Sequence, residues 1–504
     1  MTVLRDLPTI EATERLGHEI ALVARPGTAI LLEGELGAGK TTLARAIIHS
    51  LSGGVKIEVP SPTFTLVQTY ETGRMPAAHV DLYRVAEASE VSELGLSDLG
   101  RTHLVLIEWP DRLISPLVDD VLTVRLEGAG TGRRAELRGV GSWKQALERL
   151  EAISDFLPKA GFGSASRRFF EGDASFRRYE RLDRAGQSYI LMDMAARPDG
   201  PPVKHGKPYS AIAHLAEDIR AVLAVNAHLE SLGYSAPHTY AHDVQHGLAV
   251  IEDLGSRVYG RMMLAGEDMD EPMANATLLL ADMAGRKWPS EIPVPGGGHH
   301  TIPRYDTEAL TIETELLLDW YWPFLTGRDA PQEARESFSA AWSEFLPLTQ
   351  PANPVWALRD FHSPNLLWMP ERSGLRRVGL IDTQDCLLGH PAYDLASMLR
   401  DARVDVPFDV AEDMLEFYCA AREDDPGFDK AEFKRVFALL SVQRATKILG
   451  IFARLSRRDG KHGYIRHMPR VSRYLERDLA HPDLARLRDW YDRHLPANLR
   501  ASAA

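Results

Sequence analysis

The sequence predicts two domains of different fold class, an α/β domain followed by a larger α+β domain. A chain of 504 residues is too long for one hydrophobic core, so at least two domains are expected. Near residue 40, a glycine-rich phosphate-binding motif stands between a strand pattern and a helix pattern. From Asp360 onward, an aspartate, an asparagine and a second aspartate follow at the spacing of a second phosphoryl-transfer site.

The bulk composition argues against several classes of protein. It is that of a globular protein, with 44% hydrophobic and 26% charged residues, and the net charge of −13 argues against non-specific nucleic-acid binding by the whole chain. Two local basic stretches, 132–139 and 454–470, are either binding patches or solvated surface. No apolar run reaches the roughly 20 residues that cross a membrane, and no secretory signal opens the chain. The two cysteines lack metal-ligand spacing and favour a reducing cytoplasm.

Strand and helix patterns alternate through the first domain. Apolar residues at helical spacing predict helices at 9–24 and 41–51, on either side of a short strand at 28–32. Three further apolar runs and a hairpin follow, at 64–70, 79–83, 103–109 and 121–138. A glycine-rich turn near residue 140 precedes an amphipathic helix at 143–157. We therefore expect a first domain at 1–142 and a second at 143–504, with a small lobe at about 160–255 and a large, mostly helical lobe at about 256–504.

Residues 34–41, GELGAGKT, match the phosphate-binding pattern G-x-x-x-x-G-K-[ST] directly after a strand and before a helix. The glycines allow backbone N–H groups to turn toward phosphates, and the helix N-terminus adds the positive end of its dipole. Lys40 would reach the terminal phosphates of ATP, and Thr41 would bind Mg²⁺. The residues predicted to bind ATP in this loop are Gly37, Ala38, Gly39, Lys40, Thr41 and Thr42.

Two acidic residues, Asp81 and Glu108, end later apolar runs. Parallel strands bring their carboxyl ends to one edge of a sheet, beside the phosphate loop, and a metal-bound triphosphate requires carboxylates there. Glu108 ends the longer buried run and is predicted as a magnesium ligand and a catalytic residue. Asp81 is either catalytic or a surface carboxylate.

Four segments of the first domain carry a resemblance to a known family: GELGAGKTT, VPSPTFTLVQTYE, HVDLYR and IEWPDR, in that order. They resemble TsaE, the small ATPase of the bacterial machinery that installs threonylcarbamoyladenosine in tRNA. The resemblance implies an α/β P-loop NTPase fold, ATP and Mg²⁺ as cofactors, and partner subunits that carry out the transfer, with at most indirect contact to tRNA. It also implies nucleotide contacts by Trp109 and Thr13, catalysis by Asp81, and a switch segment containing Ser61 and Thr63. The alternative is a free-standing small-molecule kinase that uses the same phosphate loop.

The second constellation begins at Asp360, in LRDFHSPNLL. Asn365 follows in the pattern D-x-x-x-x-N, and Asp382 closes an apolar run 17 residues after Asn365. Phosphoryl transfer to a hydroxyl requires a carboxylate beside that hydroxyl, plus Asn and Asp ligands for magnesium. We therefore assign Asp360 as the base or orienting group, and Asn365 and Asp382 as metal ligands. Asp394 is expected to brace the catalytic loop.

These motifs, with IDTQD at 381–385, resemble the aminoglycoside-phosphotransferase and choline-kinase-like branch of the protein-kinase fold. The segments GDASFRRY, ILMD, ELLLDWYW and QRATKILGIFARLSRRDG resemble more closely the cell-wall recycling kinases that phosphorylate the anomeric hydroxyl of N-acetylmuramate and N-acetylglucosamine. The resemblance implies a two-lobed α+β domain, with a hinge at Glu252 and ATP contacts from Ser175. The phosphate loop departs from the usual kinase pattern in having one glycine, Gly172, and no lysine occupies the usual position on the third strand.

The acceptor site is weakly defined by the sequence. Carboxylates bond sugar hydroxyls and aromatic rings pack on sugar faces, which makes candidates of three residues on one predicted helix: Glu315, Asp319 and Trp320. A solvated acidic face with core aromatics fits them equally. Arg444, Lys447 and Arg454 are either ligands for a sugar carboxylate or ordinary surface charges. Two alternatives to a sugar kinase stay open, a kinase for another alcohol such as an aminoglycoside- or choline-like compound, and a nucleotide-binding pseudokinase that tethers the ATPase.

Overall fold

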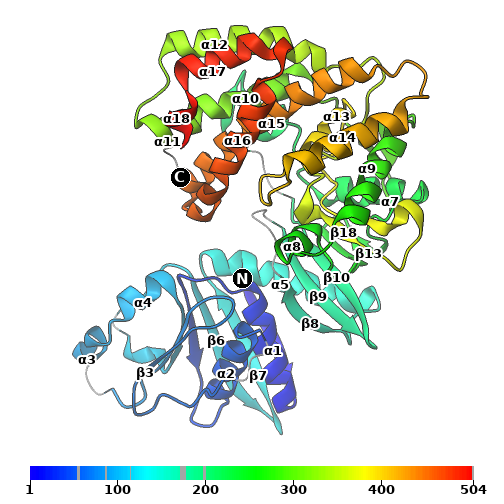
Figure 1. The fold of residues 1–504 in the computed structure, drawn as a ribbon. Helices are drawn as coiled ribbons and strands as arrows, with labels where there is room; N and C mark the ends of the chain where they lie inside the picture. Colours follow the sequence, from blue (N-terminus) through cyan, green and yellow to red (C-terminus); the bar gives the residue numbers. More distant parts are fainter. Residues whose placement is uncertain (54–56, 86–87, 114, 171–176, 197–199, 502–504) are drawn as a thin grey trace. The chain divides into compact units, whose positions relative to one another are not determined.

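The computed structural model describes residues 1–53, 57–85, 88–113, 115–170, 177–196 and 200–501 (Figure 1). These residues form two compact units, Met1–Met192 and Asp193–Ala504. Each unit has its own hydrophobic core. Gly172 and Ser175, which the sequence assigns to a phosphate loop, lie outside the described residues.

The first unit contains a seven-stranded sheet in the order β1-β7-β6-β2-β5-β4-β3. Strand β2 pairs in parallel with β5 and β6, and β4 pairs in parallel with β5, whereas β1, β7 and β3 join antiparallel. This arrangement confirms the predicted α/β class. The elements of the unit are β1 (Thr2–Leu7), α1 (Ile10–Val23), β2 (Thr28–Glu33), α2 (Lys40–Leu51), β3 (Val67–Tyr70), β4 (Ala77–Asp81), α3 (Ala88–Glu93), α4 (Leu96–Thr102), β5 (Leu104–Glu108), η1 (Pro110–Arg112), β6 (Val121–Ala129), β7 (Gly132–Gly139), α5 (Ser142–Lys159), β8 (Ser166–Phe170), β9 (Arg178–Arg184) and β10 (Gln187–Asp193).

Strand β5 is buried on both faces, as expected for a central parallel strand. Leu104 and Leu106 contribute to the core that contains residues of α1 and α2, which pack side by side (Figure 1). Val105 and Ile107, which alternate with them, contribute to a second cluster on the side of α4. The strand therefore ends, at Glu108, in a position fixed from both sides.

Helix α5 packs into the core of the first unit. Its buried residues Trp143, Leu147 and Leu150 belong to the same cluster as the α1 and α2 side chains. The sequence predicts this helix correctly, and its amphipathic pattern favours a place at the start of the second domain. The boundary between residues 142 and 143 remains a prediction. Helix α5 follows this boundary in the chain but packs in the core of the first unit.

The second unit is mostly helical after β14. It also contains the antiparallel strand pair β17–β20 and the hairpin β18–β19, beside which the predicted catalytic motifs lie. The elements of the unit are β11 (Pro202–Lys204), β12 (Lys207–Pro208), α6 (Tyr209–Ile212), α7 (Ile219–Ser231), β13 (Thr239–Asp243), β14 (Leu248–Glu252), α8 (Tyr259–Leu264), α9 (Asp270–Ala284), β15 (Glu291–Pro293), β16 (His299–Thr301), α10 (Thr307–Leu316), η2 (Leu317–Tyr321), α11 (Trp322–Thr326), α12 (Gln332–Phe345), η3 (Leu346–Thr349), β17 (Val355–Ala357), η4 (Ser363–Asn365), β18 (Leu366–Trp368), η5 (Gly374–Arg377), β19 (Val378–Leu380), β20 (Leu387–Gly389), α13 (Ala392–Leu399), α14 (Phe408–Arg422), α15 (Lys430–Asp459), η6 (His462–His467), α16 (Met468–Leu479), η7 (Pro482–Leu484), α17 (Ala485–His494) and α18 (Ala497–Ala501).

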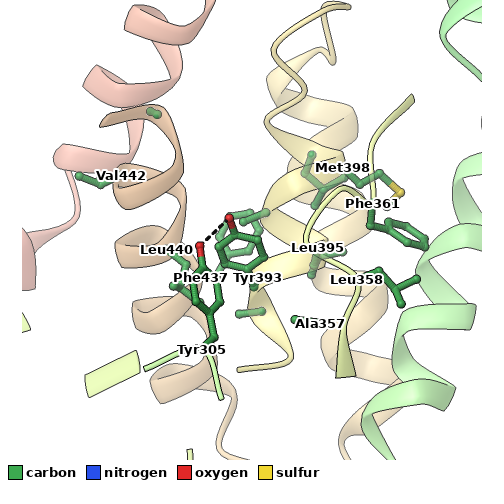
Figure 2. Close-up of a cluster of buried hydrophobic side chains, with 14 of the residues drawn as sticks. Tyr305, Ala357, Leu358, Phe361, Tyr393, Leu395, Met398, Phe437, Leu440 and Val442 are labelled. Carbon is green, nitrogen blue, oxygen red and sulfur yellow. Dashed lines mark hydrogen bonds between the residues drawn. The ribbon is translucent and has the colours of Figure 1, made fainter. Parts of the chain in front are cut away.

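Helix α15 is the longest element of the chain, with 30 residues, and it runs through the core of the second unit. By length and apolar composition it is able to cross a membrane, but 89% of its apolar window is buried inside the protein, as in the core helix of a globular domain. Figure 2 shows α13 beside α15, with Phe361 of the catalytic loop next to Met398 of α13. In the same cluster, the hydroxyl groups of Tyr305 and Tyr393 form a hydrogen bond of 3.0 Å.

Two segments of the second unit differ from the sequence prediction. Residues 289–303, whose prolines and glycines predict a loop, contain the hairpin β15–β16. Three consecutive glycines at positive φ lie in its turn. The predicted helix that carries Glu315, Asp319 and Trp320 changes to a π-helical turn at η2. Such turns are rare in helices and are enriched at functional sites.

Candidate active sites

The first candidate site lies at the carboxyl edge of the parallel strands β2, β5 and β4. In the parallel registers, Leu32 is aligned with Glu108, and Glu108 is aligned with Asp81. Both carboxylate residues are buried. The structure thus brings the two predicted carboxylates together at the strand ends beside the phosphate loop.

Glu108 is held from two sides. The hydroxyl of Thr41 donates to Glu108 Oε2 at 3.0 Å, and His79 Nε2 lies 2.9 Å from Glu108 Oε1. His79 is fully buried, and its Nδ1 has no hydrogen-bond partner within the described part of the chain. A hydroxyl and a carboxylate at this separation fit Mg²⁺, which prefers oxygen ligands. His79 orients the carboxylate that would bind this ion.

The phosphate loop needs glycine at two positions. Gly34 has a φ of +140°, and a Cβ there would lie 2.5 Å from a carbonyl oxygen of β6. Gly39 has a φ of +102° and immediately precedes α2, so its left-handed backbone turns the loop into the helix. Arg133 of β7 donates to the carbonyl oxygens of Gly37 and Ala38, each at 3.3 Å, and so braces the loop from outside.

Lys40 is folded back onto its own loop. Its Nζ donates to the carbonyl oxygens of Gly34 (2.7 Å) and Glu35 (2.9 Å) and lies 3.7 Å from the centroid of the Trp109 ring. Burial lowers the pKa of Lys40, against the opposing effect of Glu108 and two nearby aspartates. Trp109 has a φ of 60°, a strained conformation of the kind found at functional sites.

The predicted switch segment contacts the catalytic edge. Ser61 Oγ donates to Asp81 Oδ2 at 3.3 Å. Thr63, two residues further along the chain, is half-buried. Phe64 is 83% exposed, with the guanidinium of Arg84 4.4 Å from its ring. The segment thus joins a carboxylate of the site to the protein surface, and its role as a switch stays a prediction.

The second candidate site forms around the β18–β19 hairpin. Leu366 is paired with Leu380, so the residues that flank the hairpin come side by side. The side-chain amide of Asn365 donates to Asp382 Oδ2 (3.4 Å) and to the carbonyl oxygen of Asp360 (3.1 Å). An amide oxygen and a carboxylate here fit Mg²⁺. The structure therefore gathers the three residues that the D-x-x-x-x-N…D spacing predicts.

Basic side chains surround Asp360. Burial would raise the pKa of this carboxyl, but the neighbouring His362, Lys447 and Arg359 outweigh burial and hold the pKa below its usual value. Asp360 is therefore ionised at neutral pH. An ionised carboxylate is what the orientation or deprotonation of an acceptor hydroxyl requires.

Asp394 bonds the backbone of the catalytic loop. Its Oδ2 accepts from the N–H of Leu358 at 2.6 Å, and its Oδ1 accepts from the N–H of Arg359 at 2.9 Å. Burial raises the pKa of Asp394 to about 7, although these two donors oppose the shift. Arg359 has a φ of 69° and Asp382 a φ of 64°, strained conformations that the surrounding contacts must hold in place. These contacts have the form of the predicted brace.

A buried carboxylate, Glu313 of α10, supports the loop from the other side. Its Oε1 accepts from Lys447 Nζ at 3.1 Å and forms an ion pair with Arg359 Nη2, and its Oε2 accepts from Gln443 Nε2 at 3.0 Å and from the hydroxyl of Tyr305. Burial would raise the pKa of Glu313, but Lys447 and Arg359 prevail and lower it to about 2. The carboxylate is thus a fixed negative charge between two cations.

Comparisons with known proteins match these two sites to two families. Residues 7–135 match the model of the threonylcarbamoyl adenosine biosynthesis protein TsaE, and residues 166–433 match the phosphotransferase enzyme family. An N-acetylmuramate/N-acetylglucosamine kinase of Caulobacter vibrioides is 38% identical over 369 residues, which are 70% of this chain and 98% of that protein. A tRNA threonylcarbamoyladenosine biosynthesis protein TsaE of Rickettsia felis is 37% identical over 124 residues, which are 25% of this chain and 72% of that protein. The chain belongs to both families.

The chain therefore joins a TsaE-family ATPase domain to a phosphotransferase-family kinase domain, and both domains are ATP-using enzymes. This confirms the predicted fold classes of both domains. Among solved structures, the GDP and kanamycin complex of APH(2")-IIia gives a TM-score of 0.41 at 15% identity and covers 67% of this chain and 99% of its own.

Three further residues predicted to contact ATP lie on regular elements. In the TsaE-family domain, Thr13 is buried on α1, and Thr42 lies in the first turn of α2. In the kinase domain, Glu252 ends β14, and its carboxylate forms an ion pair of 2.5 Å with Arg372. Because this ion pair occupies the carboxylate, a contact of Glu252 with ATP at the hinge would come from its backbone.

The three predicted sugar-binding residues, Glu315, Asp319 and Trp320, lie at the end of α10 and in η2. Glu315 pairs with Lys204, Asp319 pairs with an arginine of α12, and both acids line a cavity of about 390 Å³. Successive helix residues are rotated by about 100°, so Glu315 projects to a different side of α10 from Glu313. The sugar-binding role of the three residues stays a prediction.

Two residues, His79 and Glu313, have supporting roles that the sequence motifs do not predict. His79 stands two residues before Asp81 on β4, and alternate residues of a strand share a face, so its position was a usable signal. Glu313 occupies a core position of α10, between Leu310 and Leu317 at helical spacing. An acid at a core position indicates a buried partner, but the sequence alone does not show which cation it meets.

Proposed function

We propose that the kinase domain transfers the γ-phosphoryl group of ATP to the anomeric hydroxyl of N-acetylmuramate and N-acetylglucosamine, in the recycling of cell-wall sugars. The assembly of Asp360, Asn365 and Asp382 supports phosphoryl transfer, and the match over 98% of the Caulobacter kinase supports the sugar acceptors. Asp360 would orient the acceptor hydroxyl and take its proton as the new O–P bond forms and the bond to ADP breaks. Asn365 and Asp382 would hold Mg²⁺ on the phosphates.

The test is phosphorylation of both sugars by the full chain, with Asp360→Asn assayed beside it. We expect a 1-phosphate product, identified by loss of reducing-end reactivity, and a fall in kcat of about 1,000-fold in the variant. Absence of turnover while ATP still binds would contradict the proposal. It would favour first another alcohol, such as an aminoglycoside- or choline-like compound, and then a pseudokinase that tethers the ATPase.

We propose for the TsaE-family domain that ATP hydrolysis drives a cycle of the protein complex that installs threonylcarbamoyladenosine in tRNA. Lys40 would bind the phosphates, Thr41 and Glu108 would hold Mg²⁺, and Asp81 would act in hydrolysis, with Ser61 and Thr63 in the switch. The contact of Thr41 with Glu108 supports this assignment. The partners are the protein subunits that carry out the transfer, and any contact with tRNA is indirect.

Hydrolysis of ATP by the full chain, with and without the purified transfer subunits, tests this second proposal. We expect the subunits to stimulate hydrolysis and Lys40→Ala to abolish it. Hydrolysis that the subunits leave unchanged would favour the alternative, a small-molecule kinase that uses the same loop.

We also propose a cytoplasmic location and a domain boundary between residues 142 and 143. The described cysteines, Cys386 and Cys419, are both free and buried, as a reducing compartment allows. Limited proteolysis of the full chain tests the boundary. A first cut near residue 140 supports it, whereas a first cut after α5 would assign α5 to the TsaE-family domain.

A further inference from the structure

Three cations lie along one side of α15, at positions 444, 447 and 454. Two of them, Lys447 and Arg444, bind groups that hold the catalytic loop in place. Lys447 Nζ donates to Glu313 and to the hydroxyl of Tyr393. Arg444 Nη1 donates to the carbonyl oxygen of Arg359 at 3.2 Å, and its guanidinium lies 4.9 Å from the Tyr393 ring.

Arg454 differs from the other two because its charge meets Tyr209 and, more weakly, Asp459 rather than the support of the catalytic loop. It is half-buried, and across the described ranges no carboxylate lies within ion-pairing distance of it. The acid that follows it on the helix, Asp459, is bound through both oxygens to Arg458, at 2.7 and 2.9 Å. Arg454 Nε is buried without a hydrogen-bond partner in the same residues. A guanidinium withdrawn from water without an anion is unfavourable, so this position suits a residue that binds an external anion.

Tyr209 of α6 holds the Arg454 side chain in place. The guanidinium carbon lies 5.0 Å from the centroid of the Tyr209 ring, within the range of a cation–π contact. Burial lowers the pKa of Arg454, and the contact with Tyr209 opposes this. The contact with Tyr209 therefore favours the charged guanidinium.

The same short helix connects Arg454 to the catalytic loop. Tyr209 begins α6, and the residue after its end, Ala213, accepts a hydrogen bond from Arg359 Nη1 at 2.8 Å. Helix α6 has four residues and is therefore about 6 Å long, so Arg454 and Arg359 contact the two ends of one short helix. Arg454 is thus joined through α6 to the residue that precedes Asp360 in the catalytic loop.

We propose that Arg454 binds an anionic substituent of the acceptor sugar and thereby favours an acidic sugar over a neutral one. The inference rests on the proposed function of the kinase domain, since N-acetylmuramate differs from N-acetylglucosamine by a lactyl ether that ends in a carboxylate. Arginine and a carboxylate form paired, charge-assisted hydrogen bonds that lysine does not reproduce. The neutral sugar leaves Arg454 without this partner.

The test compares the two sugars as substrates of the full chain. The measured quantity is the discrimination ratio, kcat/KM for N-acetylmuramate divided by kcat/KM for N-acetylglucosamine. In Arg454→Gln we expect this ratio to fall about 30-fold, mainly through KM for the acidic sugar. Arg454→Lys keeps the charge but loses the fork, and we expect a fall of about 5-fold. If the glutamine variant does not fold, the lysine variant decides, and an unchanged ratio in it contradicts the proposal.

Arg458→Gln is the matched control, because Arg458 lies one turn further along α15, is exposed and is already paired with Asp459. Its ratio should change less than about 2-fold. Equal losses for both sugars in Arg454→Gln would show a structural role for Arg454 and overturn the inference. If the wild-type chain phosphorylates neither sugar, the proposed function itself fails, an outcome distinct from turnover of both sugars with an unaltered ratio.

Discussion

The two active sites hold their carboxylates in different ways. Glu108 of the TsaE-family domain is fixed by a neighbouring strand and by the phosphate loop, through His79 and Thr41. Asp360 of the kinase domain lies on a loop that is fixed by buried charges from distant helices, with Glu313 on one side and Asp394 on the other. Removing one side chain should change a site that is held by strand register only slightly. A site that is held by buried ion pairs depends on every partner, because each removal leaves an unpaired charge.

Removing the charge of Glu313 tests this difference most severely. Glu313→Gln leaves Arg359 and Lys447 buried without their anion, so we expect the free energy of unfolding of the kinase domain to fall by about 3–5 kcal/mol and its activity to be lost. Urea unfolding of the full chain, followed by tryptophan fluorescence, measures the stability. Glu315→Gln is the control, since Glu315 lies on the same helix in a partly exposed ion pair and should cost less than about 1 kcal/mol. If both variants lost the same free energy of unfolding, the buried network would not be what holds the loop.

Acid should weaken the same support. The pKa of Glu313 is about 2 in the folded protein against an ordinary value of 4.5. Because the folded-state pKa is depressed, the stability that the carboxylate contributes is complete above pH 4.5 and is lost as the pH falls toward 2, by about 3 kcal/mol. Unfolding measured between pH 6 and 3 should show about 2 kcal/mol of this loss in the wild type, and a weaker loss in Glu313→Gln. Parallel curves for the two proteins would contradict the assignment.

The brace at Asp394 should have a smaller effect on stability but a clear effect on catalysis. In Asp394→Asn one oxygen is replaced by an NH₂ group, so one backbone N–H of the catalytic loop loses its acceptor, at a cost of about 2 kcal/mol. We expect kcat of the kinase to fall about 100-fold because the loop shifts, with KM for ATP little changed. Steady-state kinetics with either sugar measure this. A fall confined to KM would argue for a binding role instead.

His79 should show the smallest effect, because Glu108 keeps its other contact. His79→Ala should raise the Mg²⁺ concentration for half-maximal ATP hydrolysis about 10-fold, and His79→Gln, which retains a donor, by about 3-fold. Magnesium titrations of ATPase activity measure both. His49→Ala is the control, as His49 is an exposed histidine of α2 that bonds the carbonyl oxygen of Ile57. If His79→Gln and His79→Ala raised the required Mg²⁺ concentration equally, the hydrogen bond to Glu108 would not explain the role of His79.

The contrast between the sites also explains what the sequence can predict. The residues of the phosphate loop and the D-x-x-x-x-N motif act within a few positions of one another, so their patterns predict both sites, and strand ends predict Asp81 and Glu108. Glu313 meets Lys447 only through the packing of α10 on α15, which no local pattern encodes. Helix α5 is a similar case, because its amphipathic pattern predicts a buried face but not the core that this face joins.

Exchanging one residue in each site of the full chain tests most directly whether the chain holds two separate ATP sites. Lys40→Ala and Asp360→Asn are each assayed for ATP hydrolysis without sugar and for sugar phosphorylation. In Lys40→Ala we expect ATP hydrolysis to fall by at least about 100-fold, while sugar phosphorylation stays within about 2-fold of wild type. In Asp360→Asn we expect sugar phosphorylation to fall by at least about 100-fold, while ATP hydrolysis stays within about 2-fold of wild type. Loss of both activities in either variant would contradict two separate ATP sites in one chain.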